Sequence, residues 1–388
     1  MLLVGMVQHG LLHRCVGCDL YCRPRRHDWS LRVPLLARER SAMPVLFLSE
    51  PRCTLRRQAD ALIVTRRPEN GGADEEVLLK VQPDRLELVA LVGAVHVTAD
   101  ALHLCFDHGV DLAWFTSSGR LRGRAVAPAS CNADLRLCQY ARLQEDPTPL
   151  ALGFAQAKLA NAACVLVEVQ GNYSDNPLLP AAIAQLKELG QRCTAMSTDS
   201  ILGIEGAATR TYFEAFGSAF RGELSFAARR RQPPTDPVNS LLSFGYVLLT
   251  HQIAGLVEAR GMDPALGFLH RPHAGRPSLA LDLLEEFRAP VVDRFVLRLA
   301  NLRIMRPEHF HKAGSFDQDG EPQGACLMTN AGRKIFFNEW AHFLLKPLRA
   351  ADEPDPLPVG DLLRRQVERL AADFRGSRKY EPFRYRRG

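Results

Sequence analysis

A carboxylate stands between two glycines at the entrance to an apolar segment, GIEGAATRTYFEAFG, residues 203–217. The apolar side chains of this segment recur at helical spacing, which predicts a helix that faces the core. An ionised carboxylate such as Glu205 is rarely buried without a cation or hydrogen-bond donors to compensate it. Two explanations fit: Glu205 lies in the first helical turn and faces the positive end of the helix dipole, or it points inward to a bound cation.

A second group of ionisable side chains lies in GFLHRPHAGRPSLALDLLEEFR. His270 ends an apolar turn, and the helix that follows carries Asp282, Glu285 and Glu286 beside its apolar stripe. Separations of three and four residues place side chains on one helix face, where like charges repel. A divalent cation or a nearby arginine would relieve the repulsion. Carboxylates suit Mg²⁺ or Mn²⁺, imidazole leans toward Mn²⁺, iron or zinc, and such a site can activate an oxygen nucleophile against a phosphodiester.

Each of these residues also has an ordinary structural explanation. His270 can be a core histidine with satisfied hydrogen bonds, and Asp282 with Glu285 can form a solvated face paired to Arg288. The spacings match no short metal-binding motif. Spacing alone therefore leaves the metal site a minority interpretation.

The elements that must position these residues fall into regions that differ in composition and in hydrophobic periodicity. Residues 1–42 are basic and irregular. Over residues 43–125, short runs rich in Val, Leu and Phe recur at roughly ten-residue intervals, which predicts a compact antiparallel β domain. Residues 126–375 show helical periodicity, and residues 376–388 form a basic tail. We therefore predict an α+β fold, with a small N-terminal β-rich domain followed by a larger all-α C-terminal domain.

Composition narrows the class of protein. Of the 388 residues, 46% are hydrophobic and 24% charged, which is typical of a globular protein in solution. No apolar run reaches the length of about 18 residues that a membrane span needs, and no cleavage site follows the apolar N-terminal run, so we expect a cytoplasmic protein without membrane contact. Most of the ten cysteines stand singly in apolar runs, unlike a disulfide framework.

Basic residues are clustered, although the formal net charge is only +6. Arginines fill positions 229–231, and the chain ends in RKYEPFRYRRG. Basic runs interleaved with Tyr and Phe suit a polyanion whose bases can stack on the rings. A solvated tail explains the C-terminal run equally well.

Several segments, taken together, resemble one protein family. GIEGAATRTYFEAFG, DPVNSLLSFGYVLL, GFLHRPHAGRPSLALDLLEEFRAPVVDRFVL and TNAGRKIFFNEW are similar to the CRISPR-associated endonuclease and integrase that inserts new spacers. The likeness runs from about Met43 to near Arg375, and SLALDLLEEFRAP is most similar to the branch found with type I-C systems. It implies a β-rich N-terminal domain and a helical domain that holds Mg²⁺ or Mn²⁺.

The resemblance also implies roles for individual residues. The positions that match the metal ligands are Glu205, His270 and Glu285. Asp282 matches a further acidic position beside the metal, and Glu286 is left as a surface or outer-shell group. Candidate phosphate contacts are Arg210, Arg229, Arg230, Arg231 and Arg276.

The activity implied by the resemblance is transesterification. The 3′-hydroxyl of captured DNA attacks a phosphodiester at the edge of a CRISPR repeat, and water in place of the hydroxyl gives cleavage. Expected partners are double-stranded and 3′-overhang DNA, CRISPR repeat DNA, a second copy of the chain through its N-terminal domain, and the small second-numbered CRISPR-associated protein. The alternatives are a catalytically silent DNA-binding architectural subunit and a metal-dependent phosphohydrolase. The latter should carry a His-Asp pair on a core helix, whereas His27 and Asp28 lie in the N-terminal extension.

The N-terminal run HRCVGCDLYCRP resembles the C-terminal cysteine cluster of an iron–sulfur nuclease, the fourth-numbered protein of the same machinery, which makes that nuclease a candidate partner. Only three cysteines of such a cluster are present here, whereas a four-iron cluster typically has four thiolate ligands. We therefore expect residues 1–42 to be a remnant or the product of a start codon placed too far upstream, with Met43 the functional start. A zinc site on Cys15, Cys18, Cys22 and His27 is less favoured.

Overall fold

The computed structural model describes residues 45–49, 52–67, 75–86, 88–116, 121–126, 132–172, 176–194, 197–230, 233–314 and 324–387. The cysteine cluster of residues 1–42 and Arg231 lie outside these ranges, so the predictions made for them remain predictions.

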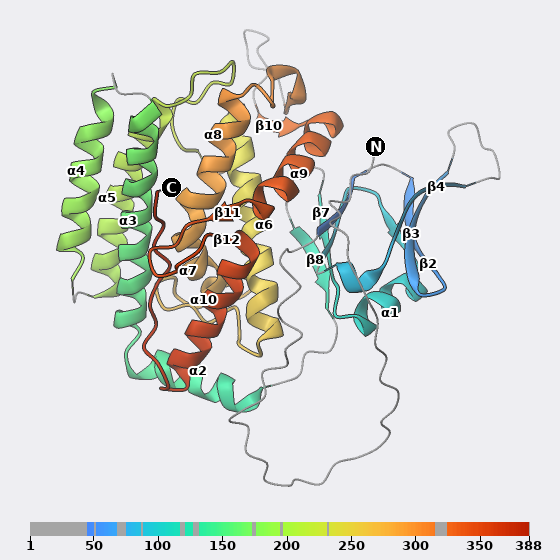
Figure 1. Cartoon of the computed structure of the whole chain (residues 1–388), viewed down its shortest axis with the longest axis horizontal. Helices are drawn as coiled ribbons and strands as arrows, with labels where there is room; N and C mark the ends of the chain where they lie inside the picture. Colours follow the sequence, from blue (N-terminus) through green and yellow to red (C-terminus); the bar gives the residue numbers. More distant parts are fainter. Residues whose placement is uncertain are drawn as a thin grey trace.

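The N-terminal domain consists of strands with one α-helix among them (Figure 1). One four-stranded sheet has the order β4-β3-β2-β6 and the other the order β1-β5-β7-β8. A 3-10 turn, η2, covers Pro83–Arg85. The other elements are β1 (Val45–Leu48), β2 (Cys53–Gln58), β3 (Ala61–Arg66), β4 (Glu76–Val81), β5 (Leu88–Val92), β6 (His96–Val97), α1 (Ala99–Asp107), β7 (Asp111–Phe115) and β8 (Leu121–Ala125).

The expected all-antiparallel arrangement is wrong. β5 pairs in parallel with both β1 and β7, and β2 pairs in parallel with β6. The run ALHLCFDHG, residues 101–109, is one of the short apolar runs that predicted strands, but most of it lies in helix α1, which begins after the N-cap Thr98. Short apolar runs do not distinguish a buried strand from a buried helix. The unbroken apolar run of β5, LVALV, is the pattern of a parallel strand covered on both faces.

Strand β5 shows how the two domains share their cores. Val89 and Leu91 are buried in the cluster of the β domain, against residues of α1 and the other sheet. Leu88, Ala90 and Val92 are buried in the cluster of the helical domain. Successive side chains of a strand point to opposite faces, so this sheet is packed on both sides and joins the domains.

The C-terminal domain is mainly helical, as predicted (Figure 1). Two short strand pairs, β9 with β10 and β11 with β12, interrupt it. Its elements are α2 (Ala133–Glu145), α3 (Thr148–Asn172), α4 (Leu178–Arg192), α5 (Thr198–Gly217), α6 (Pro237–Ala259), α7 (Ser278–Phe287), the π-helical turn η3 (Arg288–Asp293), α8 (Arg294–Asn301), η4 (Pro307–His309), β9 (Phe310–Ala313), β10 (Ala325–Met328), α9 (Asn330–Leu345), β11 (Pro347–Leu348), β12 (Leu357–Pro358) and α10 (Val359–Phe374).

Local signals set the helix ends. Asp236 caps α6 by accepting a hydrogen bond from the Asn239 N–H, and Pro237 takes the first helical position. Helix α5 begins at Thr198, because the Ser197 side chain accepts the Ser200 N–H. Glu205 therefore lies two turns inside α5, and the explanation that placed it in the first helical turn is wrong.

Two helices, α3 and α6, are long and apolar enough to cross a membrane by length and composition. Their most apolar windows are 67% and 72% buried inside the protein. Both helices contribute many side chains to the main hydrophobic cluster. They have the burial expected of core helices.

The C-terminal residues 376–387 fold back onto the helical domain, where they run among its helices (Figure 1). The Asn161 amide donates hydrogen bonds to the carbonyls of Glu286 and Phe383 and accepts one from the Tyr385 N–H. Phe383 is 1% exposed and Tyr385 7%. These rings belong to the core, so the interpretation that offers them to nucleic-acid bases, and the one that leaves the tail solvated, are both wrong for them.

Candidate metal centre

Two of the three predicted ligands contact one lysine, and the third lies beside them. Lys158, on α3, forms an ion pair with Glu205 on α5, and its Nζ lies 2.7 Å from Oε2 of Glu285 on α7. His270, in the loop before α7, places Nε2 3.9 Å from Glu285 Oε1. The Thr209 hydroxyl, one turn along α5, donates a 2.7 Å hydrogen bond to Glu205 Oε1. Side chains far apart in the sequence are thus brought to one place.

Asp282 orients the histidine. Its Oδ1 lies 2.7 Å from His270 Nδ1 and accepts the His270 backbone N–H at 2.8 Å. Its Oδ2 accepts the N–H groups of Phe268 and Leu269. Both oxygens of this fully buried carboxylate are therefore occupied, and Nε2 is left facing Glu285. A carboxylate on the second ring nitrogen is the usual support of a metal-binding histidine, which suits the predicted place of Asp282 beside the metal.

Charge stabilises the ionised form of Glu285. Its side chain is only 4% exposed, and Arg288 Nη1 donates to Oε1 at 3.0 Å. Burial raises the pKa of Glu285, but the charges of Arg288, Lys158 and His270 outweigh burial and hold the pKa well below its ordinary value. Burial lowers the pKa of His270, yet the hydrogen bond and charge of Asp282, with Glu285, leave it raised. The pairing with Arg288 is confirmed, whereas the suggested solvated face is wrong, because both acidic residues are buried.

The donor set suits a divalent ion by its chemistry, although its side chains are paired with cations and not arranged around an ion. Within the described ranges, no group of three or more His, Cys, Asp or Glu side chains is arranged to hold a metal ion. The Lys158 ammonium lies between the carboxylates instead. The buried Oε2 of Glu285 accepts no hydrogen bond from any described residue. Its 2.7 Å contact with Lys158 Nζ is close enough for a hydrogen bond, but the angle is unsuitable. Two carboxylates, one with such an orphaned oxygen, and an oriented imidazole suit Mn²⁺ or Mg²⁺.

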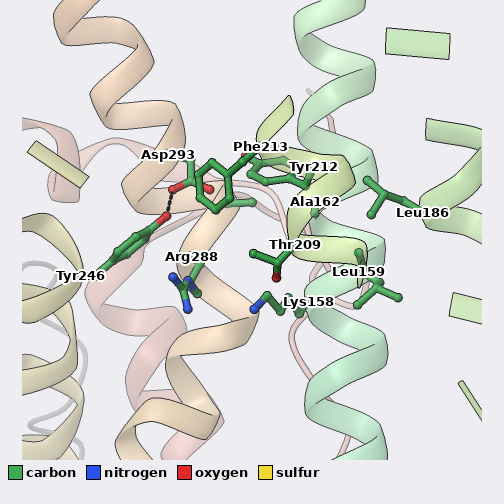
Figure 2. A pocket seen from close by; sticks show the side chains of 12 residues that line it. Lys158, Leu159, Ala162, Leu186, Thr209, Tyr212, Phe213, Tyr246, Arg288 and Asp293 are labelled. Carbon is green, nitrogen blue, oxygen red and sulfur yellow. Dashed lines mark hydrogen bonds between the residues drawn. The ribbon is translucent and has the colours of Figure 1, made fainter. Parts of the chain in front are cut away.

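A small cavity adjoins this centre (Figure 2). Its volume is about 20 Å³, room for a single water molecule. Lys158 and Arg288 line it, together with a buried polar group in which the Tyr246 hydroxyl donates to Asp293. The Arg288 guanidinium lies 4.2 Å from the centroid of the Tyr246 ring, and burial raises the pKa of Asp293 to about 6. These contacts hold the arginine that pairs with Glu285.

The predicted phosphate contacts differ in their surroundings. Arg229 donates to Asn239 and Ser243 and lies 5.4 Å from the Tyr246 ring centroid, so it supports the interior. Arg276 donates to Ser278 and to a backbone carbonyl in the loop before α7. The two remaining described arginines, Arg210 and Arg230, are exposed.

Sequence reasoning missed one residue of the centre, Lys158, and misplaced another beside it, Glu286. Lys158 is the lone cation in the apolar run FAQAKLANAACVLV, and this was a usable signal, because a buried lysine is almost always paired. Glu286, expected as a surface or outer-shell group, is fully buried. It accepts hydrogen bonds from Tyr380, Gln366 and the Phe383 N–H, so it anchors the C-terminal segment.

The fold and the site define a two-domain α+β protein whose helical domain brings acidic residues and one oriented histidine together between α3, α5 and α7. A sequence profile described as "CRISPR associated protein Cas1" matches residues 46–342. The chain is 34% identical over 301 residues to "CRISPR-associated endonuclease Cas1 2" of Rhodospirillum rubrum, covering 74% of this chain and 84% of that one. It is 30% identical over 357 residues to "CRISPR-associated endonuclease Cas1 1" of Chlorobaculum tepidum, covering 86% and 100%. The chain belongs to the Cas1 family.

Solved structures share the fold. A casposase bound to integration product superposes with a TM-score of 0.72 at 22% identity, covering 86% of this chain and 91% of the casposase. A CAS1 protein from Thermotoga maritima superposes with a TM-score of 0.67 at 21% identity, covering 86% and 96%. The likeness agrees with the predicted order of a β-rich domain followed by a helical one.

Proposed function

We propose that this protein is a metal-dependent DNA endonuclease and integrase of CRISPR adaptation, which joins the 3′-hydroxyl ends of captured DNA to the ends of a CRISPR repeat by transesterification. The observation that carries the proposal is that Glu205 and Glu285 share one cation, Lys158, while His270 Nε2 lies 3.9 Å from Glu285. The names of the two relatives, both endonucleases, support the same chemistry.

The ligands of the ion would be Glu205, Glu285 and His270. A bound Mg²⁺ or Mn²⁺ would supply Lewis-acid stabilisation of the negative charge that develops on the phosphate. Asp282 holds the imidazole with Nε2 toward the acidic pair, and Arg288 keeps Glu285 ionised and in place. The glycines flanking Glu205 are exposed, and a Cβ added at Gly203 or Gly206 would meet no atom within 4 Å. This face of α5 therefore has room for a DNA backbone.

The partners follow from the same proposal. They are double-stranded and 3′-overhang DNA, CRISPR repeat DNA, a second copy of the chain bound through the N-terminal domain, and a Cas2 protein. In support, the fold superposes on a chain of a "Cas6-RT-Cas1--Cas2 complex" with a TM-score of 0.70 at 22% identity, covering 89% of this chain and 36% of that one. A Geobacter sulfurreducens relative is an "exonuclease Cas4/endonuclease Cas1 fusion", 32% identical over 316 residues, which supports a Cas4-type nuclease as a further partner. With these partners, the protein would act in the prokaryotic cytoplasm.

Strand transfer tests the catalytic assignment. We expect Glu205→Gln and His270→Ala to lower transfer of a labelled 3′-hydroxyl fragment into a repeat-bearing plasmid by roughly a hundredfold or more. Binding of the same fragment should persist. Glu188→Gln on α4, an exposed carboxylate, is the matched control. Wild-type rates in both site variants would refute the assignment, and a wild-type chain that binds DNA without any transfer in Mn²⁺ would favour the silent architectural subunit.

Salt dependence tests the phosphate contacts. Because Arg210 and Arg230 are exposed, neutralising them should weaken DNA binding and flatten its dependence on salt. Arg229 is a poor choice for this test, because its loss would also disturb the interior. An unchanged salt slope in Arg210→Gln and Arg230→Gln would place the DNA path elsewhere.

A further inference from the structure

Lys158 is a charged residue in the middle of an apolar helix. Its neighbours Phe154, Leu159 and Ala162 on α3 are buried, and its own side chain is 11% exposed. The ammonium reaches Glu205 on α5 and Glu285 on α7 at once. In Figure 2 the nitrogen ends of Lys158 and Arg288 lie at the same end of the cavity. Two cations therefore face the two carboxylates that the proposed ion would share.

The charges of the two glutamates and of the two cations that face them balance without any metal. Glu205 and Glu285 contribute two negative charges, and Lys158 and Arg288 contribute two positive charges. A divalent ion added to these four side chains would leave an excess of two positive charges, of which the buried Asp282 carboxylate beside His270 would offset at most one. Like charges a few ångströms apart repel strongly in a partly buried site. The ion can bind well only if one of the resident cations gives up its place.

We propose that Lys158 is the internal counter-cation of the metal centre, holding Glu205 and Glu285 together until a divalent ion displaces it and then serving as a contact for the DNA phosphate. The inference rests on the proposed function, since it concerns the same centre. Lys158 is the cation that gives way because its ammonium contacts both carboxylates and therefore occupies the position that the ion would take. Arg288 contacts only Glu285 and is held by the Tyr246 ring as well.

The proposal couples ion binding to DNA binding. Loading the ion leaves positive charge in excess, and a phosphodiester brings the negative charge that compensates it. Each ligand should therefore raise the affinity of the other by the same factor. Removing the charge of Lys158 should weaken that coupling, because the loaded centre then carries less excess charge.

Titration with Mn²⁺ tests the competition without relying on activity. Calorimetry without DNA should show that Lys158→Met binds Mn²⁺ about tenfold or more tightly than wild type. The metal-free variant should melt at a lower temperature, and Mn²⁺ should raise its melting temperature more than that of wild type. A 3′-overhang duplex should increase Mn²⁺ affinity more in wild type than in the variant. Lys187→Met, an exposed lysine on α4, is the matched control and should match wild type throughout.

The outcomes separate this inference from the function on which it rests. A folded Lys158→Met chain whose Mn²⁺ affinity is equal to or weaker than that of wild type overturns the counter-cation. If neither chain binds Mn²⁺, the metal centre itself is refuted. If Lys158→Met does not fold, the double variant Lys158→Met/Glu205→Gln decides, because it removes one charge of each sign. Recovery of folding in the double variant supports the counter-cation, and failure to recover overturns it.

Discussion

Glu286 provides a pH-dependent test of how helix α7 is held. It follows the candidate ligand Glu285 on α7 but accepts hydrogen bonds from Tyr380, Gln366 and the Phe383 N–H. Burial raises the pKa of Glu286 from 4.5 to about 7, although these hydrogen bonds act to lower it. The folded chain therefore keeps this proton at pH values where the unfolded chain has lost it.

The sign and size of the effect follow from linkage. Below pH 4.5 both states hold the proton, and the stabilisation is fully present. As the pH rises toward 7 the folded state binds more protons than the unfolded state, so stability falls. Each pH unit in this window corresponds to about 1.4 kcal/mol. Between pH 5 and pH 8 the loss from this one group should be about 2–3 kcal/mol.

Glu286→Gln isolates the effect, because glutamine has the same shape and no charge. Its carbonyl can take the place of Oε2, which accepts two N–H donors, and its amide can donate to the Tyr380 hydroxyl. We expect urea unfolding in EDTA to show that the free energy of unfolding of the variant, relative to that of wild type, increases by about 2–3 kcal/mol between pH 5 and pH 8. Other titrating groups cancel in this difference.

A difference that stays flat with pH would contradict the reasoning, because it would mean that Glu286 ionises in the folded chain as it does in water. A difference of opposite sign would mean that the hydrogen bonds outweigh burial. Glu188→Gln, which removes an exposed carboxylate from α4, is the control and should show no such dependence.

Three further substitutions test the packing that positions the centre, each by urea unfolding at pH 7. Phe383→Ala should lower the free energy of unfolding by about 3–5 kcal/mol, because the ring is buried and its centroid lies 4.6 Å from that of the stacked Phe287 ring. A loss under about 1 kcal/mol would show that the C-terminal segment is not part of the core. Gly245→Ala should lower the free energy of unfolding by about 1–3 kcal/mol, because the added Cβ would lie 2.7 Å from the Val292 side chain. An unchanged urea midpoint would show that η3 shifts to make room for it. Arg124→Met should lower the free energy of unfolding by about 1–3 kcal/mol, because it removes the guanidinium that pairs with Asp111 of β7 and Glu258 of α6. An unchanged free energy of unfolding would mean that this bridge does not help to hold the two domains together.

Local signals in the sequence were reliable guides to the helices. Asp236, the proline after it and Gly261 are start and stop signals that can be read in the sequence, and α6 begins directly after Asp236 and ends two residues before Gly261. The apolar stripe of residues 203–217 likewise predicted a helix facing the core, and Tyr212 and Phe216 are buried there. Capping and helical periodicity act over a few neighbouring residues, so they can be read without knowing the fold.

The strand directions and the charge partners could not be read in this way. The run of β5 is apolar throughout, and only its pairing with β1 and β7 shows that it is parallel and covered on both faces. Glu205 looked like a residue at a helix start, because nothing in its own segment shows how far upstream α5 begins. Glu286 looked like a surface or outer-shell group because the Tyr380 and Phe383 groups that bury it come from the end of the chain.

The sequence by itself determined the order of the two domains, the helices of the second and the candidate ligands Glu205, His270 and Glu285, the last through resemblance to a family. Only the tertiary structure decided that Lys158 lies between the two glutamates and that both oxygens of Asp282 are already occupied. The physical reason is that periodicity and capping depend on adjacent residues, whereas the pairing of buried charges depends on which helices pack together.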